Sequence, residues 1–116
     1  MQTSIMLICI MLATLGDWLP AARWWKGNLP EWDLVSTSRD GRSVLLGEAK
    51  AWKRRATVDA LRPEVRRIRA RAIPRWSSMH PAPELHWALF VPEVAPRVPR
   101  MIDGVRIVTL EELLGK

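Results

Sequence analysis

The sequence predicts an α/β fold in which one mixed sheet carries helices on its faces. Two runs of β-forming residues flank an Asp40-Gly41 pair, a dipeptide typical of a tight β-hairpin. After Lys50 the apolar residues recur every three or four positions, which is the period of a helix. A further apolar run, Leu85–Val91, has the length of a strand. A hairpin followed by a crossover helix and another strand gives both antiparallel and parallel pairing.

The N-terminal segment is strongly apolar from Ile5 to Leu15, and a helix is predicted over residues 4–15. This run is too short for a helix to span a bilayer, and no Lys or Arg precedes it as in a secretory signal, so we expect no membrane association. We expect a buried first helix that ends at Gly16; a fragment of a longer chain or a wrongly chosen start codon are the alternatives. The predicted division is therefore residues 1–16, an apolar helix or truncated segment, and residues 17–116, the folded domain.

Three strands are predicted before the central helix. A short strand is expected over Arg23–Lys26, and turn-forming residues at 27–30 separate it from the next strand. The hairpin strands follow over Trp32–Thr37 and Ser43–Ala49, joined by a loop at 38–42. The second hairpin strand is a nearly continuous apolar run, which is typical of a central strand buried on both faces.

The central helix is predicted from a single apolar stripe. Its members are Val58, Leu61, Val65, Ile68 and Ala72. Because Pro63 lacks a backbone donor, we expect the regular helix to begin near Arg62 or to bend there, and Pro74 to end it.

The remaining elements are shorter. A loop is expected over residues 75–84, before the strand over Leu85–Val91. A proline-rich surface connection over 92–99 then leads to a last strand over Val105–Thr109. Thr109 is placed to cap a terminal helical turn, with a glutamate three residues later as in a capping box.

Length and composition are those of one globular domain. The 116 residues are 48% hydrophobic and 26% charged, so disorder is not expected to dominate. Cys9 is the only cysteine, which excludes an intrachain disulfide, and no Cys/His spacing suits zinc. We expect a cytoplasmic protein. No Gly-rich loop followed by Lys and Ser or Thr is present, which excludes ATP hydrolysis by that route.

The net charge of +6 is concentrated in one stretch. Between Lys50 and Arg75 the only acidic residues are Asp59 and Glu64. A clustered basic surface attracts polyanions through counterion release, although a solvated helix face in an Arg-rich proteome would look similar. The candidates for nucleic-acid contact are Lys53, Arg54, Arg55, Arg66, Arg67 and Arg69.

The hairpin supplies the candidate chemistry. Side chains alternate along a strand, so Glu31 and Asp33 share one face, and Glu48 shares a face with Lys50. Pairing of the two strands would bring acids and one ammonium to one sheet edge. Mg²⁺, or Mn²⁺ in its place, prefers hard oxygen ligands, and we predict ligation by Asp33, Glu48 and the Ala49 carbonyl. Lys50 would orient or deprotonate the attacking water, or offset charge on the phosphate.

A Glu-x-Lys pair also occurs by chance in strands whose polar residues simply face water. Here it ends a hydrophobic strand, follows a strand that bears Asp33, and precedes a basic helix, which together favour a metal site. Trp52 could stack on a base, but the rim of a core is its commoner place. His86 is expected to be packed or at a sheet edge rather than to bind a ligand.

These residues resemble a known superfamily. Asp33, followed by Glu48-x-Lys50 on the next strand, in a helix-strand-strand-strand-helix-strand order, is similar to the PD-(D/E)xK restriction-endonuclease-like superfamily. The resemblance implies that Asp33 and Glu48 bind the metal and that Lys50 is the catalytic lysine. It also implies the corresponding mixed-sheet fold and a DNA substrate.

A narrower resemblance rests on Trp24–Trp52 and extends over about residues 17–114. The Trp-Trp-Lys-Gly-Asn segment, the Glu-x-Asp strand and the Leu-Leu-Gly-Glu-x-Lys strand resemble a domain of unknown function. That domain is attached to the C-terminal end of archaeal-type AAA ATPases in prokaryotes. The resemblance implies an AAA ATPase domain as a partner in the parent protein.

The chain departs from the superfamily pattern in two places. Pro30 stands before Glu31 rather than before Asp33, and the first helix is apolar where many members carry an acid. We expect a metal-dependent endodeoxyribonuclease-like domain that acts on or binds DNA, as a fragment or a stand-alone form of the ATPase-associated domain. The alternatives are a catalytically inactive module of the same fold, which binds DNA or a partner ATPase, and a fragment without independent function.

Overall fold

The computed structural model describes residues 18, 22–24, 32–71 and 83–113. The elements in chain order are β1 (Ala22–Trp24), β2 (Trp32–Thr37), β3 (Ser43–Ala49), α2 (Val58–Ala70), β4 (Glu84–Val91), β5 (Met101–Ile102), β6 (Val105–Thr109) and α3 (Leu110–Leu113). The helix predicted over residues 4–15 and Glu31 lie outside the described residues.

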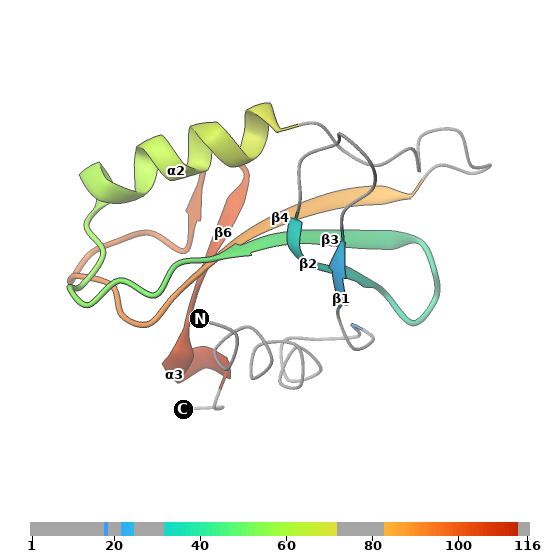
Figure 1. The fold of residues 1–116 in the computed structure, drawn as a ribbon, viewed down its shortest axis with the longest axis horizontal. Coiled ribbons are helices and arrows are strands. Elements are labelled where there is room, and N and C mark those ends of the chain that lie inside the picture. Colours follow the sequence, from blue (N-terminus) through green and yellow to red (C-terminus); the bar gives the residue numbers. More distant parts are fainter. Residues whose placement is uncertain (1–17, 19–21, 25–31, 72–82, 114–116) are drawn as a thin grey trace.

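The strands form one six-stranded sheet in the order β1-β2-β3-β4-β6-β5. The β1–β2, β2–β3 and β5–β6 pairs are antiparallel, whereas β3–β4 and β4–β6 are parallel. Helix α2 crosses one face of the sheet, and α3 lies on the opposite side near the end of β6 (Figure 1). The predicted mixed α/β sheet with helices on its faces is confirmed.

The hairpin between β2 and β3 closes as the Asp-Gly pair indicated. Gly41 has a φ of +73°, a left-handed conformation that glycine adopts without strain, and its N–H donates to the Ser38 carbonyl over 3.0 Å. The Asp40 carboxylate accepts hydrogen bonds from the Ser38 hydroxyl (2.6 Å) and the Arg42 N–H (2.9 Å). These two bonds, the one from Ser38 first, lower the pKa of Asp40.

The sheet separates two clusters of buried side chains. The α2-side cluster includes Val44 and Leu46 of β3, together with the inward face of α2. The α3-side cluster includes Leu45 and Ala49 of β3, together with Leu113 of α3. Because side chains of β3 alternate between the two clusters, Glu48 follows Val44 and Leu46 onto the face that α2 covers.

Gly47 lets β2, β3 and β4 approach closely on the α3 side. A Cβ at this position would lie 2.7 Å from Leu34 Cδ1 and 2.9 Å from Phe90 Cε2. Both neighbours are buried, at 0% and 2% exposure. Leu34 pairs with Gly47, and this is the last paired position before Asp33 and Glu48. The glycine therefore sets the spacing of the two strands where the candidate site begins.

Helix α2 begins at Val58, so of the two alternatives predicted at Pro63 the start near Arg62 is wrong. Thr57 caps it, since its hydroxyl accepts a hydrogen bond from Ala60 N at 3.2 Å. Pro63 lies inside the helix, where it withholds one N–H from the Asp59 carbonyl. Asp59 is exposed, so water can serve that carbonyl. The helix also ends before Pro74, at Ala70.

Smaller differences concern strand ends. The first strand is shifted to Ala22–Trp24, and the two-residue strand β5 was not predicted. The predicted cap at Thr109 is present, because its hydroxyl accepts a hydrogen bond from Glu112 N at 3.3 Å. Within the described part of the chain, no helix has the length and apolar character needed to cross a membrane.

Candidate active site

The carboxyl end of β3 presents Glu48 and Lys50 beneath α2. Their side chains are 13% and 25% exposed, and Lys50 Nζ lies 3.9 Å from Glu48 Oε1. Lys50 N donates a 2.9 Å hydrogen bond to the Phe90 carbonyl, which continues the pairing with β4 past the end of β3. The parallel β3–β4 pair thus fixes the backbone from which both charged side chains emerge.

Asp33 reaches the same place from β2. Its Oδ2 accepts a hydrogen bond at 3.0 Å from the N–H of Ala49, the residue between Glu48 and Lys50. β2 is irregular here, because Trp32 belongs to the α2-side cluster whereas Leu34 belongs to the α3-side cluster. Regular alternation would put both on one face. Asp33 lies between these two residues, and its carboxylate meets the β3 backbone.

Five charged side chains form an alternating ion-pair chain. It runs from Arg71 through Glu48, Lys50 and Glu64 to Arg67. Arg71 Nη2 lies 3.1 Å from both Glu48 oxygens, and Arg67 Nη1 lies 2.8 Å from Glu64 Oε1. Lys50 Nζ lies 3.7 Å from that same Glu64 oxygen. The predicted Glu48–Lys50 pair is therefore the centre of a larger network.

Arg71 is held by the end of α2. It is the residue after the last helical turn, and its N–H donates to the Ile68 carbonyl over 3.2 Å. The guanidinium carbon stands 4.9 Å from the centre of the Trp32 ring. This stacking aims the guanidinium at Glu48. Sequence reasoning assigned Arg71 no role, because no local pattern places a helix terminus over a particular strand residue.

Glu64 is the second site residue that sequence reasoning missed. It is 7% exposed and shares the inward face of α2 with Leu61, Val65 and Ile68. A signal existed, since position 64 falls at the three-residue step of this apolar stripe. A charged residue in such a stripe is informative, because carboxylates are almost never fully buried without a partner.

The oxygen atoms that Asp33 and Glu48 offer are of the type that a hard divalent cation prefers. Asp33 and Glu48 offer carboxylate oxygens from neighbouring strands, and magnesium commonly takes one or two carboxylates with water or phosphate in its remaining positions. The described residues contain no group of three or more His, Cys, Asp or Glu side chains arranged to hold a metal. A cation here would compete with Arg71 for Glu48, because Arg71 Nη2 contacts both carboxylate oxygens.

The six residues predicted to contact nucleic acid are all exposed. Lys53, Arg54 and Arg55 lie in the loop between β3 and α2, and Arg66, Arg67 and Arg69 lie on α2. Two of these charges are partly offset, since Arg55 pairs with Glu93 at 2.9 Å and Arg67 with Glu64. Arg69 stacks over the Trp87 ring, 4.2 Å from its centre.

The other aromatic and histidine candidates have packing roles, as expected. Trp52 packs against the α2-side cluster and is partly buried. His86 meets Trp18 edge to face, with ring centres 5.8 Å apart.

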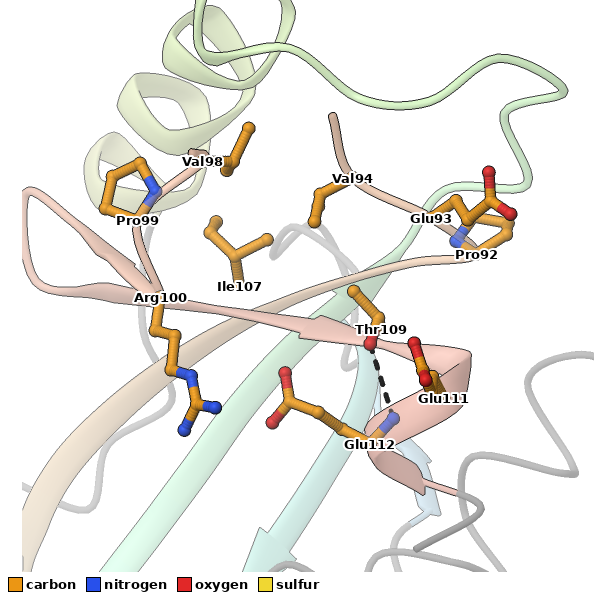
Figure 2. A pocket seen from close by; sticks show the side chains of 10 residues that line it. All are labelled: Pro92, Glu93, Val94, Val98, Pro99, Arg100, Ile107, Thr109, Glu111 and Glu112. Atoms are coloured by element: carbon orange, nitrogen blue, oxygen red, sulfur yellow. Dashed lines mark hydrogen bonds between the residues drawn. The ribbon is translucent and has the colours of Figure 1, made fainter. Parts of the chain in front are cut away.

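A hollow of about 340 Å³ lies elsewhere, at the carboxyl ends of β4 and β6. Figure 2 shows Val94 and Val98 at one end of it, and Arg100 and Glu112 at the other. None of the residues predicted for the metal site lines this hollow. The candidate site is instead the charged cluster under α2.

The sheet order and the crossover helix are those of a restriction-endonuclease-like fold. No family model and no curated protein matches the sequence. Among solved structures, the chain is similar to a repair endonuclease from Pyrococcus abyssi, with a TM-score of 0.55 and 16% identity. The alignment covers 90% of this chain and 43% of that one, so the chain spans less than half of that protein. At this identity the likeness shows the fold alone.

Proposed function

We propose that this chain is a metal-dependent nuclease domain that hydrolyses phosphodiester bonds in DNA. One observation carries the proposal: the Asp33 carboxylate accepts a hydrogen bond from the N–H of Ala49, the residue between Glu48 and Lys50, so both acids and the amine occupy one end of β3. Two carboxylates beside a lysine are the groups that phosphodiester hydrolysis with magnesium requires. The likeness to a repair endonuclease is consistent with this chemistry.

Each residue has a separate role in this proposal. Asp33 and Glu48, with the Ala49 carbonyl, would hold Mg²⁺ or Mn²⁺, which supplies a Lewis acid and an activated water. Lys50 emerges one peptide beyond Ala49, where its ammonium offsets the charge that develops on the phosphate. Arg71 must leave Glu48 before a cation binds there, and a DNA phosphate can receive it, since guanidinium groups pair well with phosphate.

A plasmid-nicking assay with Mg²⁺ or Mn²⁺ tests the activity. Wild type should nick, whereas Asp33→Ala and Lys50→Ala should lose about a hundredfold or more in rate. Glu84→Ala is a matched control, because Glu84 is an exposed acid that pairs only with His86 among the described residues. An inactive wild type, or nicking that persists undiminished in both site variants, would refute the proposal.

The second candidate is a non-catalytic module of the same fold that binds DNA or a partner ATPase. The contact of Arg71 with both Glu48 oxygens favours it, because this arrangement neutralises one metal ligand. A DNA contact through α2 predicts salt-dependent affinity that weakens in Arg66→Ala and Arg69→Ala. Affinity that is unchanged in both variants at every salt concentration would reject α2 as the contact.

The association with an AAA ATPase and a cytoplasmic location are parts of the same proposal. The narrow motif resemblance over Trp24–Trp52 supports the ATPase link. Genomic sequence upstream of Met1 tests it: a P-loop ATPase in frame would support a common parent protein, and an unrelated gene directly upstream would count against it.

A further inference from the structure

We infer that Glu64 is a positioning residue for Lys50, an inference that rests on the proposed nuclease function for its kinetic consequence. Glu64 Oε1 lies 3.7 Å from Lys50 Nζ, from the side of α2, while Glu48 Oε1 lies 3.9 Å from the same ammonium, from β3. The ammonium is thus held between two carboxylates that belong to two different elements.

The burial of Glu64 calls for an explanation other than packing. Glu64 occupies the inward stripe of α2 at 7% exposure. Its Oε1 is fully buried, and no hydrogen bond to it is found among the described residues, because the Arg67 approach at 2.8 Å lacks hydrogen-bond alignment. Burying a carboxylate with an unmade hydrogen bond is unfavourable, and an apolar side chain of the same size would suit this stripe better.

The ion pair with Arg67 does not explain why a carboxylate is buried at position 64. Arg67 belongs to the same helix and its side chain is 57% exposed, so its 2.8 Å contact ties Glu64 to no other element of the fold. Lys50 is 25% exposed and is the more enclosed of the two cations that Glu64 contacts. The contact with Lys50 is therefore the one that links the buried Glu64 carboxylate of α2 to the end of β3.

Lys50 needs such a restraint. Its backbone is fixed by the 2.9 Å bond to Phe90, but a lysine side chain has four rotatable bonds and much rotamer freedom. Glu48 alone cannot hold the ammonium, because its carboxylate contacts Arg71 in this structure and would turn to a metal in the proposed function. When Glu48 turns to a cation, Glu64 remains to keep Lys50 beside the reacting phosphate.

The test compares Glu64→Gln and Glu64→Met with wild type. Glutamine removes the charge at nearly constant shape, and methionine fills the stripe with an apolar chain. Glu93→Gln is the matched control, since Glu93 also pairs with an arginine but is 66% exposed. The first measurement is the NMR order parameter of the Lys50 ammonium, with the exposed Lys53 as internal reference. The second is the pair of constants kcat and KM for plasmid nicking.

We expect both Glu64 variants to fold, with melting temperatures within about 5 °C of wild type. The Lys50 order parameter should fall toward that of Lys53 in both variants and stay unchanged in the Glu93 control. kcat should drop by about tenfold to a hundredfold with KM unchanged, because the ammonium loses its position and not its charge.

Two results would overturn the inference. One is a Lys50 order parameter that does not change in either Glu64 variant. The other is a loss of the folded state in both variants, since Glu64 would then serve the core. If wild type nicks no DNA, the nuclease proposal fails by itself, and the NMR measurement still decides whether Glu64 restrains Lys50.

Discussion

Gly47→Ala tests whether the close approach of the strands builds the site. The new Cβ would lie 2.7 Å from Leu34 Cδ1 and 2.9 Å from Phe90 Cε2, distances that no relaxed carbon pair adopts. Neither neighbour can move into solvent, because both are buried. Overpacking of this kind costs about 1–3 kcal/mol, and replacing a strand glycine returns about 0.5–1 kcal/mol of backbone entropy. The difference between these two ranges is about 0–2.5 kcal/mol, and we expect a net destabilisation near its middle, about 1 kcal/mol.

Urea unfolding of wild type, Gly47→Ala, Leu34→Ala and the double variant measures this cost. Leu34→Ala alone should destabilise by about 2–5 kcal/mol, since Leu34 is fully buried. The double variant should be more stable than the sum of the two changes by about 1 kcal/mol, because the smaller side chain makes room for the new methyl group. Phe90 remains in the way, so the rescue is partial.

The same change should reach the site, because Leu34 and Gly47 are the last pair before Asp33. Strands forced apart here would lengthen the 3.0 Å bond from Ala49 N to the Asp33 carboxylate. Hydrogen exchange of the Ala49 amide should therefore quicken in Gly47→Ala beyond the global loss of stability. Additive energies in the cycle, together with unchanged Ala49 exchange, would refute the reasoning.

Three further predictions follow from single contacts. Arg71→Lys keeps the charge but loses the guanidinium contact with Glu48, so Mn²⁺ affinity measured by calorimetry should rise about tenfold; equal or weaker affinity would contradict this. Thr57→Ala removes the cap of α2 and should lower the free energy of unfolding in urea by about 1 kcal/mol, and no loss would argue against the cap. Because the Ser38 hydroxyl helps lower the pKa of Asp40 from its ordinary 3.8, the stability advantage over Asp40→Asn should be complete above that pH. The stability advantage of wild type should decline as the pH falls below 3.8. An advantage that does not depend on pH would contradict the lowered pKa of Asp40.

The hairpin and the strands on either side of it were predictable because their signals are local. The Asp-Gly pair requires a left-handed glycine at a definite place in the turn, and Gly41 is found there. Strand alternation then put Glu48 and Lys50 on one face. Apolar runs located the buried strands, since β4 begins only one residue before the predicted start at Leu85.

The contacts that complete the site depend on how distant elements are placed, and no local pattern encodes that placement. Arg71 meets Glu48 only because α2 runs back over β3. The start of α2 was misplaced because the proline rule outweighed the capping residue Thr57. In the sequence, Glu64 stands out only as one of two acidic residues in a basic stretch. Its position three residues after Leu61 in the apolar stripe nevertheless indicates that it faces inward.

The proposed function requires Asp33 and Glu48 to bind one divalent cation at the end of β3. Addition of Mn²⁺ to the isotopically labelled chain tests it, because the paramagnetic ion broadens the NMR signals of nearby amides. Broadening should centre on Ala49, be lost in Asp33→Asn and in Glu48→Gln, and be kept in Glu84→Gln. Broadening centred elsewhere, or unaffected by either site variant, would contradict it.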